Sequence, residues 1–515
     1  MSKSYILKVC LFATGLSGIV AEYILATLAS YFIGDSVFQW AMIVSIMLFA
    51  MGLGSRFSKF FESGLLQKFI YIEFALSLLV AFSSLLAYSA TSYTIYSGFI
   101  IYFLSIVIGL LIGMEIPLVV RINDEFESLR INVASVMEKD YYGSLVGGLF
   151  FAFVGLPYLG LTYTPFVLGF INFIVAFLLF GILYKHIAAN LQKQIAVIAF
   201  VIFVSLSAGI FIAKPVILHG EQKKYKDKVI FSQQSKYQKI VITQWKNDYW
   251  LFLNGNQQLS SLDEVMYHEP LVHPAVKLSK KAEKVLILGG GDGCAARELL
   301  KYPDIKSIKL VDLDPEMTKL SAKHQVLKKL NKNSMNNEKV KITNADGYAF
   351  IEKDTNFYDV IIIDLPDPKT VELGRLYSHE FYSLCYKRLR QNGVIITQAG
   401  SPYYATKAFL CIDKTMQSAG FTTALLHNQI VTLGEWGWVI GLKTNFDINL
   451  KNVLRTFTYE NVATEWLNNE AMQLMTSFGK EIYPFPAMKD SVQINFIHDP
   501  VLYHYYLKGN WELYN

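Results

Sequence analysis

The stretch VLILGGGDG, residues 285–293, decides the fold of the C-terminal half of this chain. Four apolar residues are typical of a buried strand, and the glycines after them permit a tight turn and the close approach of a ligand. A helix that starts there would present free backbone N–H groups to that ligand. Because an ordinary strand–helix turn can have the same composition, its meaning depends on the flanking segments.

Outward from this stretch, apolar runs alternate with amphipathic segments. The runs are SIKLVDLD (307–314), KVKITNADG (339–347), YDVIIIDLPDP (358–368) and GVIITQAG (393–400). This alternation predicts a parallel sheet with crossover helices, which binds ligands at the carboxyl ends of its strands. We therefore expect a Rossmann-like, methyltransferase-type α/β domain over residues 266–445.

Three of the strand ends carry residues suited to an adenosine. Gly289 and Gly291 lie in the first turn, Asp312 ends the second strand, and Asp346 with Gly347 follows the third. An acid at the second strand end can accept hydrogen bonds from both ribose hydroxyls. The third motif is placed to meet an adenine edge. Together they predict an adenosine-bearing ligand, and their order also fits an S-adenosylmethionine-dependent methyltransferase.

Charge separates two interpretations of this site. Asp364 and Asp367 flank one turn after the fourth strand, and Asp292 adds a third acid in the glycine turn. Three carboxylates would repel the carboxylate of S-adenosylmethionine, whereas they would stabilise a decarboxylated sulfonium donor and a cationic polyamine. The acids therefore favour a site for a polyamine. The simpler alternative for Asp364 and Asp367 is an Asx-type turn with solvated carboxylates.

A small β region and a C-terminal extension flank this domain. Residues 229–265 contain aromatic and β-branched runs and the tight-turn pair Asn254-Gly255, which predict short strands. The run DEVMYHE (263–269) adds polar groups, although taken alone it is typical of a helix start. We expect residues 446–515 to form a mostly helical extension.

The N-terminal half has the composition of a membrane protein. The chain is 53% hydrophobic and 17% charged, against about 25% charged in an average soluble domain. Apolar segments occur at about 9–31, 38–54, 69–89, 97–120, 143–160, 163–184 and 195–213. Most reach the roughly 20 residues that a helix needs to cross a bilayer. We expect residues 1–215 to be a multi-pass α-helical transmembrane domain in the cell membrane, joined to the β region by a basic linker, 216–228.

Glu22 and Glu115 fall inside these segments, where they either pair with neighbours or line a path for a cation such as a polyamine.

The basic residues conflict about the side on which the C-terminal half lies. Lys3 and Lys8 predict a cytoplasmic N-terminus, and seven crossings would then place the C-terminal half outside. The lysines after the last segment favour a cytoplasmic C-terminal half instead. A re-entrant fifth segment, which Pro157 interrupts, would misplace only two charges, and the topology stays open. We expect the C-terminal half to lie on the cytoplasmic face, where an adenosine-bearing ligand would be supplied.

Charge and cysteine content exclude other classes of protein. A net charge of +5 is too small to indicate a nucleic-acid partner. Four cysteines without a close pair predict neither a disulfide framework nor a metal site. His268 and His273 also lack a set of Cys or carboxylate neighbours that would complete a metal site.

Taken together, the motifs resemble spermidine synthase, a polyamine aminopropyltransferase. The resemblance covers about 229–445 and rests on Tyr237-Gln238 and on the stretches 253–275, 286–293, 311–315, 345–351, 358–368 and 376–382. The apolar front half is similar to that of the multi-pass bacterial membrane branch of this family. The resemblance implies transfer of an aminopropyl group from decarboxylated S-adenosylmethionine to putrescine, giving spermidine and methylthioadenosine. It implies no cofactor and no metal, with the donor as co-substrate, and a homo-oligomer.

The resemblance also implies roles for the residues that match on the donor side. Four of them would hold the methylthioadenosine moiety: Gln238, Asp312, Asp346 and Gly347. Asp292 would bind the primary amine of the aminopropyl arm.

On the acceptor side, His268 and Asp367 would bind the polyamine. Asp364 would be the catalytic acid/base, with Tyr267 helping to orient the attacking nitrogen. Trp436, in GEWGW, would form an apolar wall for the methylenes of the substrate.

Departures from the family pattern leave the acceptor open. Leu365-Pro366 stands where soluble members usually have two small hydroxyl residues, Val371 replaces a later proline, and Tyr-Pro-Ser is absent near Val431–Leu433. Cadaverine, agmatine or a longer polyamine are therefore alternatives to putrescine. Two other functions also stay open: a membrane-bound S-adenosylmethionine-dependent N-methyltransferase, and a polyamine transporter or sensor with a binding domain.

Overall fold

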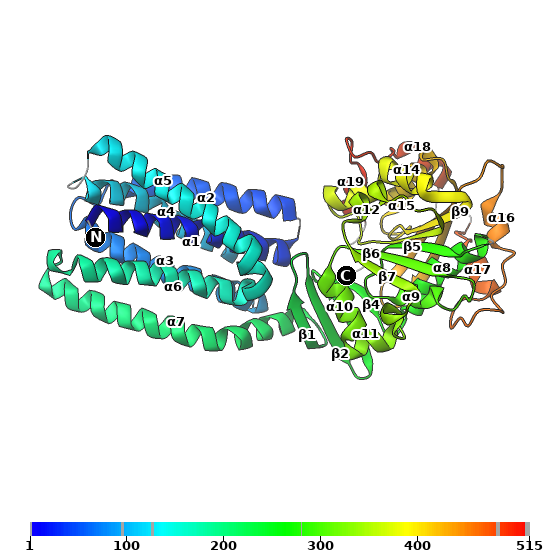
Figure 1. Ribbon diagram of the computed structural model, residues 1–515, viewed down its shortest axis with the longest axis horizontal. Helices are drawn as coiled ribbons and strands as arrows, with labels where there is room; N and C mark the ends of the chain where they lie inside the picture. Colours follow the sequence, from blue (N-terminus) through cyan, green and yellow to red (C-terminus); the bar gives the residue numbers. More distant parts are fainter. Residues whose placement is uncertain are drawn as a thin grey trace. The chain divides into compact units, whose positions relative to one another are not determined.

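The computed structural model describes residues 3–34, 36–93, 97–124, 128–279, 281–479 and 485–509. Two compact units make up the chain, Met1–Lys236 and Tyr237–Asn515 (Figure 1).

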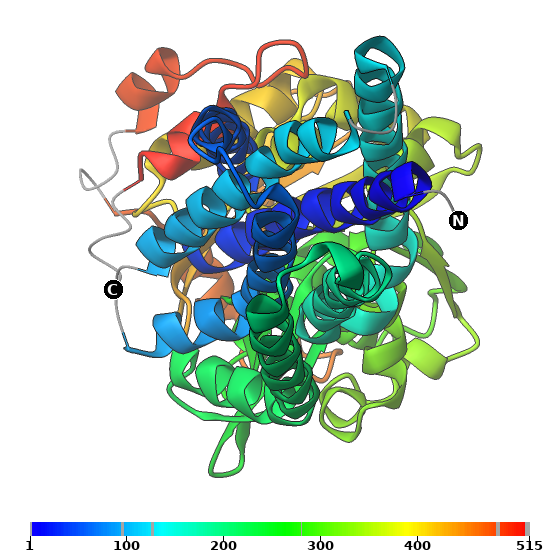
Figure 2. The same cartoon turned by 90° about the vertical axis from the view of Figure 1, so that its left-hand side faces the viewer.

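The first unit is a bundle of long apolar helices. They are α1 (Lys3–Ile33), α2 (Ser36–Ser58), α3 (Leu65–Tyr93), α4 (Ser97–Asn123), α5 (Leu129–Phe150), α6 (Gly160–Ile182) and α7 (Ala189–Lys224). A short 3₁₀ turn, η2 (Tyr184–His186), precedes α7, and strand β1 (Lys228–Gln234) follows it. Helix α1 runs through the middle of the unit and packs against α2, α4, α5 and α6 (Figure 2).

Among the described residues, six helical stretches are long and apolar enough to cross a membrane, judged by length and composition. We expected about seven apolar segments, and the difference lies in Leu129–Ile182, a single stretch of 54 residues that contains the fifth and the sixth. Within it, α5 continues into a π-helix, η1 (Phe151–Leu159), which contains Pro157. Helix α6 begins at Gly160, whose φ of 62° only glycine adopts easily. In Figure 1, α6 runs in the direction opposite to α5, so the fifth segment is the second half of a long helical rod and not an isolated re-entrant turn.

Among the described residues of this bundle, four acids are buried: Glu22, Glu73, Glu115 and Glu221. Glu22 and Glu115 are 8% and 1% exposed, and Glu73 of α3, which the sequence did not single out, is completely buried. Both oxygens of Glu73 and one of Glu115 have no hydrogen-bond partner among the described residues. Arg121, further along α4, donates instead to the carbonyl oxygens of Phe61 and Ser58.

The second unit is built on a seven-stranded sheet in the described part of the chain, with the order β10-β11-β9-β8-β5-β6-β7. Its strands are β5 (Lys284–Gly289), β6 (Ser307–Asp312), β7 (Val340–Asn344), β8 (Tyr358–Asp364), β9 (Leu389–Gln398), β10 (Thr422–Ile430) and β11 (Gly434–Leu442). Strands β5 to β9 are parallel, which confirms the predicted Rossmann-like sheet. The antiparallel pair β10–β11 completes one edge and was not predicted.

Helices cover both faces of this sheet. They are α8 (Val265–Leu278), α9 (Cys294–Leu299), α10 (Pro315–Lys323), α11 (Gln325–Leu330), α12 (Gly347–Lys353), α13 (Val371–Gly374), α14 (His379–Arg388) and α15 (Thr406–Ser418), with 3₁₀ turns η3 (Ser334–Asn336) and η4 (Arg375–Tyr377). Along β5, Val285 and Ile287 join one apolar core while Leu286 and Leu288 join the other. This alternation explains why the strand is apolar throughout, since both of its faces are buried.

A small antiparallel sheet precedes this domain, as expected. It contains β2 (Lys239–Trp245), β3 (Asp248–Leu253) and β4 (Asn256–Ser260). Asn254 and Gly255 join β3 to β4 with φ values of 50° and 80°, the geometry that a tight hairpin turn requires.

The C-terminal extension differs from the expectation of a mostly helical segment. It holds four short helices, α16 (Leu450–Leu454), α17 (Asn469–Met475), α18 (Phe485–Ser491) and α19 (Leu502–Leu507). These account for fewer than half of its described residues. Asn449 and Asn468 cap the starts of α16 and α17, where their side chains accept the backbone N–H groups of Asn452 and Ala471.

Candidate active site

The carboxyl ends of β5 and β8 meet at the point where the strand order reverses, which is where such sheets bind ligands. Gly289 of β5 pairs with Asp364 of β8. A Cβ atom on Gly289 would lie 2.0 Å from the carbonyl oxygen of Asp364, and one on Gly291 would lie 2.5 Å from Oδ2 of Asp312. The glycine turn therefore has no room for side chains and brings its backbone against both acids.

Two of the residues expected to hold the donor lie around the loop after β6. Oδ1 of Asp312 accepts the backbone N–H of Asp314 at 2.9 Å, and burial raises the pKa of Asp312 to about 6. Nε2 of Gln238 donates to Oδ2 of Asp314 at 2.9 Å. The small β region thus delivers Gln238 to the same loop that ends in Asp312.

Asp346 and Gly347 follow β7 at the start of α12. Oδ1 of Asp346 caps this helix by accepting the N–H of Ala349 at 2.9 Å, and its other oxygen pairs with the guanidinium of Arg375. The Cβ of a residue in place of Gly347 would approach only Leu288, at 3.9 Å. Arg375, which the sequence did not single out, also lies over the ring of Tyr348, 5.8 Å from its centroid.

Three predicted residues converge at the glycine turn. His268, Asp292 and Asp364 each offer one atom, and these atoms lie within 4.8 Å of one another. Nε2 of His268 is 3.8 Å from Oδ1 of Asp292, which also accepts the N–H of Cys294 at 2.7 Å. The arrangement gathers two carboxylates beside one imidazole, a suitable environment for an ammonium group.

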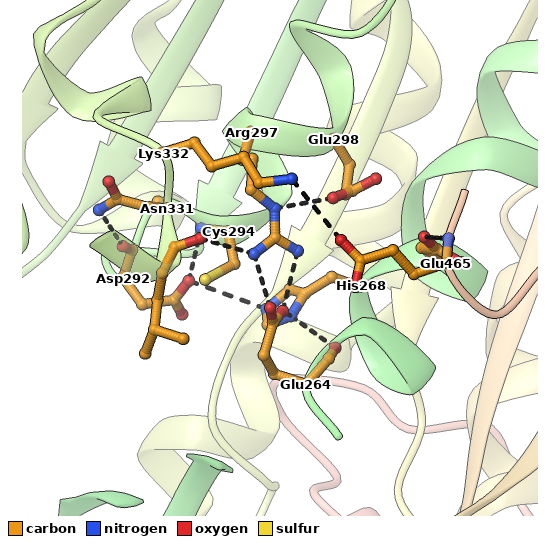
Figure 3. Close-up of polar contacts among 12 residues, drawn as sticks. Glu264, His268, Asp292, Cys294, Arg297, Glu298, Asn331, Lys332 and Glu465 are labelled. Atoms are coloured by element: carbon orange, nitrogen blue, oxygen red, sulfur yellow. Dashed lines mark hydrogen bonds and ion pairs between the residues drawn. The ribbon is translucent and has the colours of Figure 1, made fainter. Parts of the chain in front are cut away.

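A buried ion-pair network lies behind His268 (Figure 3). Nδ1 of His268 is 2.8 Å from Oε2 of Glu264, and the guanidinium of Arg297 binds both oxygens of Glu264 at 2.6 and 2.9 Å. Burial acts to lower the pKa of His268, but the bond to Glu264 and the charges of Asp292 and Glu264 outweigh it and raise the pKa to about 9. For Glu264, burial acts in the opposite direction and the bonds from His268 and Arg297 prevail, so its pKa falls to about 2. His268 is therefore an imidazolium at neutral pH, which makes it a poor metal ligand.

A second cluster, Glu269, His273 and Glu298, is fully buried beside this network. The expectation that His268 and His273 lack carboxylate or Cys neighbours was therefore wrong, because packing brings residues that are distant in sequence to both histidines. Glu269 accepts the backbone N–H groups of residues 465–467 at 2.6 to 2.9 Å. Glu298 binds Arg297, His273 and Lys301. Because these oxygens already have partners, the cluster ties the C-terminal extension to α8 and α9.

Asp364 carries one tyrosine partner. The hydroxyl of Tyr267 donates to Oδ1 of Asp364 at 2.8 Å, and burial together with the charge of Asp292 raises the pKa of Asp364 to about 6. The ring of Tyr267 packs against Trp438, whose centroid is 5.5 Å away and which is fully buried. Trp436, two residues earlier on the same face of β11, is half-buried. The sequence analysis named Trp436 and missed Trp438, which lies on the same face of β11 and contacts Tyr267.

Asp367, at the other end of the same turn, has several partners. Oδ2 accepts from the hydroxyl of Tyr506 at 2.6 Å, and Oδ1 lies 3.4 Å from Nε2 of Gln398. The hydroxyl of Tyr377 donates to the carbonyl oxygens of the two residues between the acids, at 3.2 and 3.0 Å. Gln398 donates in turn to Tyr377 at 2.6 Å. This network, which sequence reasoning missed apart from the stretch containing Tyr377, fixes the turn that separates Asp364 from Asp367.

Comparison with known proteins places this site in a family. Residues 264–452 match the spermine/spermidine synthase domain. The polyamine aminopropyltransferase 2 of Aquifex aeolicus (strain VF5) is 43% identical over 514 residues, 99% of either chain. A polyamine aminopropyltransferase of Oceanobacillus iheyensis is 38% identical over 96% of either chain. The crystal structure of spermidine synthase from Thermotoga maritima covers 49% of this chain and 85% of that one, at 29% identity and a TM-score of 0.43.

The chain therefore belongs to the spermine/spermidine synthase family, and it is an enzyme of the polyamine aminopropyltransferase class. Members of this family use decarboxylated S-adenosylmethionine as a co-substrate and need no metal cofactor. The resemblance found in the sequence is confirmed.

Proposed function

We propose that this chain transfers the aminopropyl group of decarboxylated S-adenosylmethionine to putrescine, and that it does so as a membrane-anchored enzyme. The observation that carries the proposal is the turn with Asp364 and Asp367 at its two ends, opposite Asp292 across the glycine turn. A donor with one ammonium group and an acceptor with two would find a carboxylate for each cationic end.

In the proposed reaction the lone pair of one putrescine nitrogen attacks the methylene carbon next to the sulfonium. The carbon–sulfur bond breaks, its electron pair stays on sulfur, and methylthioadenosine leaves as a neutral molecule. The attacking nitrogen must lose a proton, and Asp364 accepts it. A carboxylate whose pKa burial has raised to about 6 is a stronger base than an ordinary aspartate and is still ionised at neutral pH.

In this proposal the other site residues position the donor and the acceptor. Tyr267 orients Asp364 and the attacking nitrogen, and Asp367 binds the distal ammonium of putrescine. Asp292 receives the amine of the aminopropyl arm, with His268 beside it. Trp436 would extend the apolar wall that Trp438 begins. Holding two reactants in line contributes several kcal/mol to such reactions.

On the donor side, we assign the ribose to Asp312 and the adenine and sulfur-bearing portion to Gln238, Asp346 and Gly347. The raised pKa of Asp312 reflects a buried carboxylate that neutral ribose hydroxyls can solvate. The decarboxylated donor keeps the amine of S-adenosylmethionine but lacks its carboxylate, so the repulsion that the three acids would exert on S-adenosylmethionine itself is absent.

The support for membrane anchoring comes from the apolar outer surface of the helical unit. Large apolar side chains there are strongly exposed, including Phe49 at 67%, Phe153 at 68% and Phe211 at 81%. Soluble surfaces rarely expose so many. Helices α1 to α7 alternate in direction (Figure 1), so in a membrane residue 3 and strand β1 would lie on opposite sides. We assign the catalytic unit to the cytoplasmic side, where the donor is supplied.

The side is testable by labelling, because Cys10, Cys294, Cys385 and Cys411 are all buried and give little background. A single cysteine at exposed Lys226, in the linker after α7, is treated with a membrane-impermeant maleimide in intact cells. Protection from the reagent supports a cytoplasmic catalytic unit. Labelling would contradict it and would agree with the basic loops at the N-terminal end. Extraction of the protein by alkaline carbonate would contradict membrane anchoring itself.

The activity is tested on detergent-solubilised full-length protein with putrescine, offered decarboxylated or ordinary S-adenosylmethionine in separate reactions. We expect methylthioadenosine and spermidine from the decarboxylated donor only, and a loss of about 10²–10⁴-fold in Asp364→Asn. Asp304→Asn, an exposed acid in the loop before β6, is the matched control and should keep full activity. S-Adenosylhomocysteine from the ordinary donor would mean a methyltransferase and overturn the proposal.

A further inference from the structure

The two acids of the Asp364–Asp367 turn are each held by a tyrosine, but the tyrosines come from different parts of the chain. Tyr267 of α8 donates to Asp364 at 2.8 Å, and Tyr506 of α19 donates to Asp367 at 2.6 Å. Tyr267 lies within the matched family domain, 264–452, whereas Tyr506 lies more than fifty residues beyond it. The C-terminal extension thus contributes a residue to the end of the site where we place the distal ammonium of the acceptor.

Helix α19 is firmly attached to the domain through Asn495. Oδ1 of Asn495 accepts the N–H groups of Val501 and Leu502 at the start of the helix, both at 3.2 Å. Its Nδ2 donates to the carbonyl oxygens of Gly374 and Tyr377, at 2.9 and 3.2 Å. One side chain therefore joins α19 to the segment that supports the Asp364–Asp367 turn.

Tyr506 itself is enclosed by the domain. Its side chain is only 4% exposed, and the edge of its ring lies 3.4 Å from the position that a Cβ would take on Gly400. Gly400 has a φ of 68°, so it is favoured as glycine for its backbone as well. A buried phenol with little room to rotate holds the Asp367 carboxylate in one orientation.

A positive charge lies at the same place. Nζ of Lys369 is 3.9 Å from Oδ2 of Asp367 and 5.9 Å from the centroid of the Tyr506 ring. Its amine also donates to Oδ1 of Asn256 at 2.9 Å, which holds it beside the turn. An acceptor that extended past Asp367 would bring a further ammonium against this lysine, and like charges repel.

We propose that Tyr506 is a positioning residue for the acceptor, and that Tyr506 and Lys369 together close the amine site beyond Asp367, so that the enzyme accepts a short diamine and rejects longer polyamines. The inference rests on the proposed function and adds a length limit to it. Tyr506 orients one oxygen of Asp367, and the other, which Gln398 approaches at 3.4 Å, accepts from the distal ammonium as well, at a fixed distance from Asp364. Lys369 excludes a third cationic group.

The test uses full-length protein and compares putrescine, cadaverine and spermidine as acceptors. In Tyr506→Phe we expect the KM for putrescine to rise about tenfold, because one hydrogen bond to a charged group is lost, while kcat and the KM for the donor change less than threefold. The hydroxyl of Tyr506 acts to lower the pKa of Asp367 against the burial that raises it. The increase in KM should therefore grow as the pH falls, which a merely structural defect would not produce.

Two further variants test the length limit. Tyr506→Ala and Lys369→Ala should each raise kcat/KM for spermidine relative to putrescine by about tenfold or more. The matched control is Tyr505→Phe on the same helix, whose hydroxyl accepts the N–H of Gln493 at 3.3 Å, outside the site. It should leave both acceptor KM values unchanged.

The outcomes separate this inference from the proposed function. A wild-type enzyme without aminopropyl transfer to any amine contradicts the proposed function. A wild-type enzyme that transfers to putrescine, with Tyr506→Phe at the wild-type putrescine KM, contradicts the role of Tyr506. Unchanged rejection of spermidine in both Tyr506→Ala and Lys369→Ala contradicts the length limit, as does a wild-type enzyme that uses spermidine as well as putrescine.

Discussion

Buried acids in the two units of this molecule differ in how many hydrogen-bond and ion-pair partners they have. In the α/β unit, Glu264, Glu269 and Glu298 are at least 94% buried, and each has several cationic or N–H partners. In the helical unit, Glu73 and Glu115 are as deeply buried, yet three of their four carboxylate oxygens have no hydrogen-bond partner among the described residues. Glu221, at the end of α7, is also buried but accepts from the hydroxyls of Tyr31 and Ser232, so the contrast concerns the middle of the bundle. The difference shows that burial alone does not mark an active site. In the α/β unit, cationic and N–H partners hold the buried acids beside the candidate site, and the predictions below test how far that distinction extends.

The largest effect on stability should come from Arg297, which neutralises two buried acids at once. Arg297→Met leaves Glu264 and Glu298 without their shared cation, and removing one partner of a buried ion pair typically costs about 3–5 kcal/mol. Thermal unfolding monitored with detergent present measures the loss. The control is Arg390→Met, since Arg390 is 43% exposed in its pair with Asp359 and should lose at most about 1 kcal/mol. Equal losses in both variants would contradict the comparison.

The pH dependence of stability should report the charge on His268. Its pKa is about 9 in the folded chain, against about 6.5 in an unfolded one. The stabilisation is therefore fully present below about pH 6.5 and is lost as the pH rises through 9, by at most about 3 kcal/mol. Unfolding of the wild type and of His268→Gln, compared between pH 6 and 10, measures it. A constant difference between the two proteins across this range would rule out the charged imidazole.

A smaller effect on catalysis is expected for Tyr267. Tyr267→Phe removes the hydrogen bond that orients Asp364, and we expect kcat to fall about 10- to 100-fold with little change in donor KM. Tyr358→Phe is the matched control. Its hydroxyl donates to Asp354 at 2.6 Å at the opposite end of the same strand, so kcat should be unchanged. Equal kcat values in the two variants would mean that Asp364 needs no tyrosine.

The smallest effect should come from the helical unit. Glu73→Gln and Glu115→Gln keep the shape of the side chains and remove almost no interaction that the described residues provide, so stability should change by less than about 1 kcal/mol. Aminopropyl transfer should be unaffected in both. A loss above about 3 kcal/mol, or a loss of polyamine uptake into vesicles, would show that these acids bind a cation and would remove the contrast between the two units.

Much of the α/β unit could be predicted because its signals are local. Val285–Leu288 is buried on both faces and therefore apolar throughout, and Asn254-Gly255 has the positive φ values that few other residues adopt. Strand β11 was missed because it is buried over most of its length and lacks the alternation that distinguishes a strand from a buried helix. The length of the helical rod through Pro157 could not be predicted either, since a proline usually ends a helix and a π-helical turn here accommodates it.

For the site, the sequence by itself determined the family, the order of the strand-end motifs and the acids at Asp292, Asp312, Asp364 and Asp367, because each follows directly from a strand that its own residues specify. Only the tertiary structure decided which groups surround them. Arg297 reaches Glu264 from 33 positions away, and Tyr506 reaches Asp367 from 139. Such contacts leave no periodic pattern in the chain, since they depend on how whole elements pack. The raised pKa of His268 and the contacts of Tyr506 and Lys369 with Asp367 follow from that packing and not from local sequence.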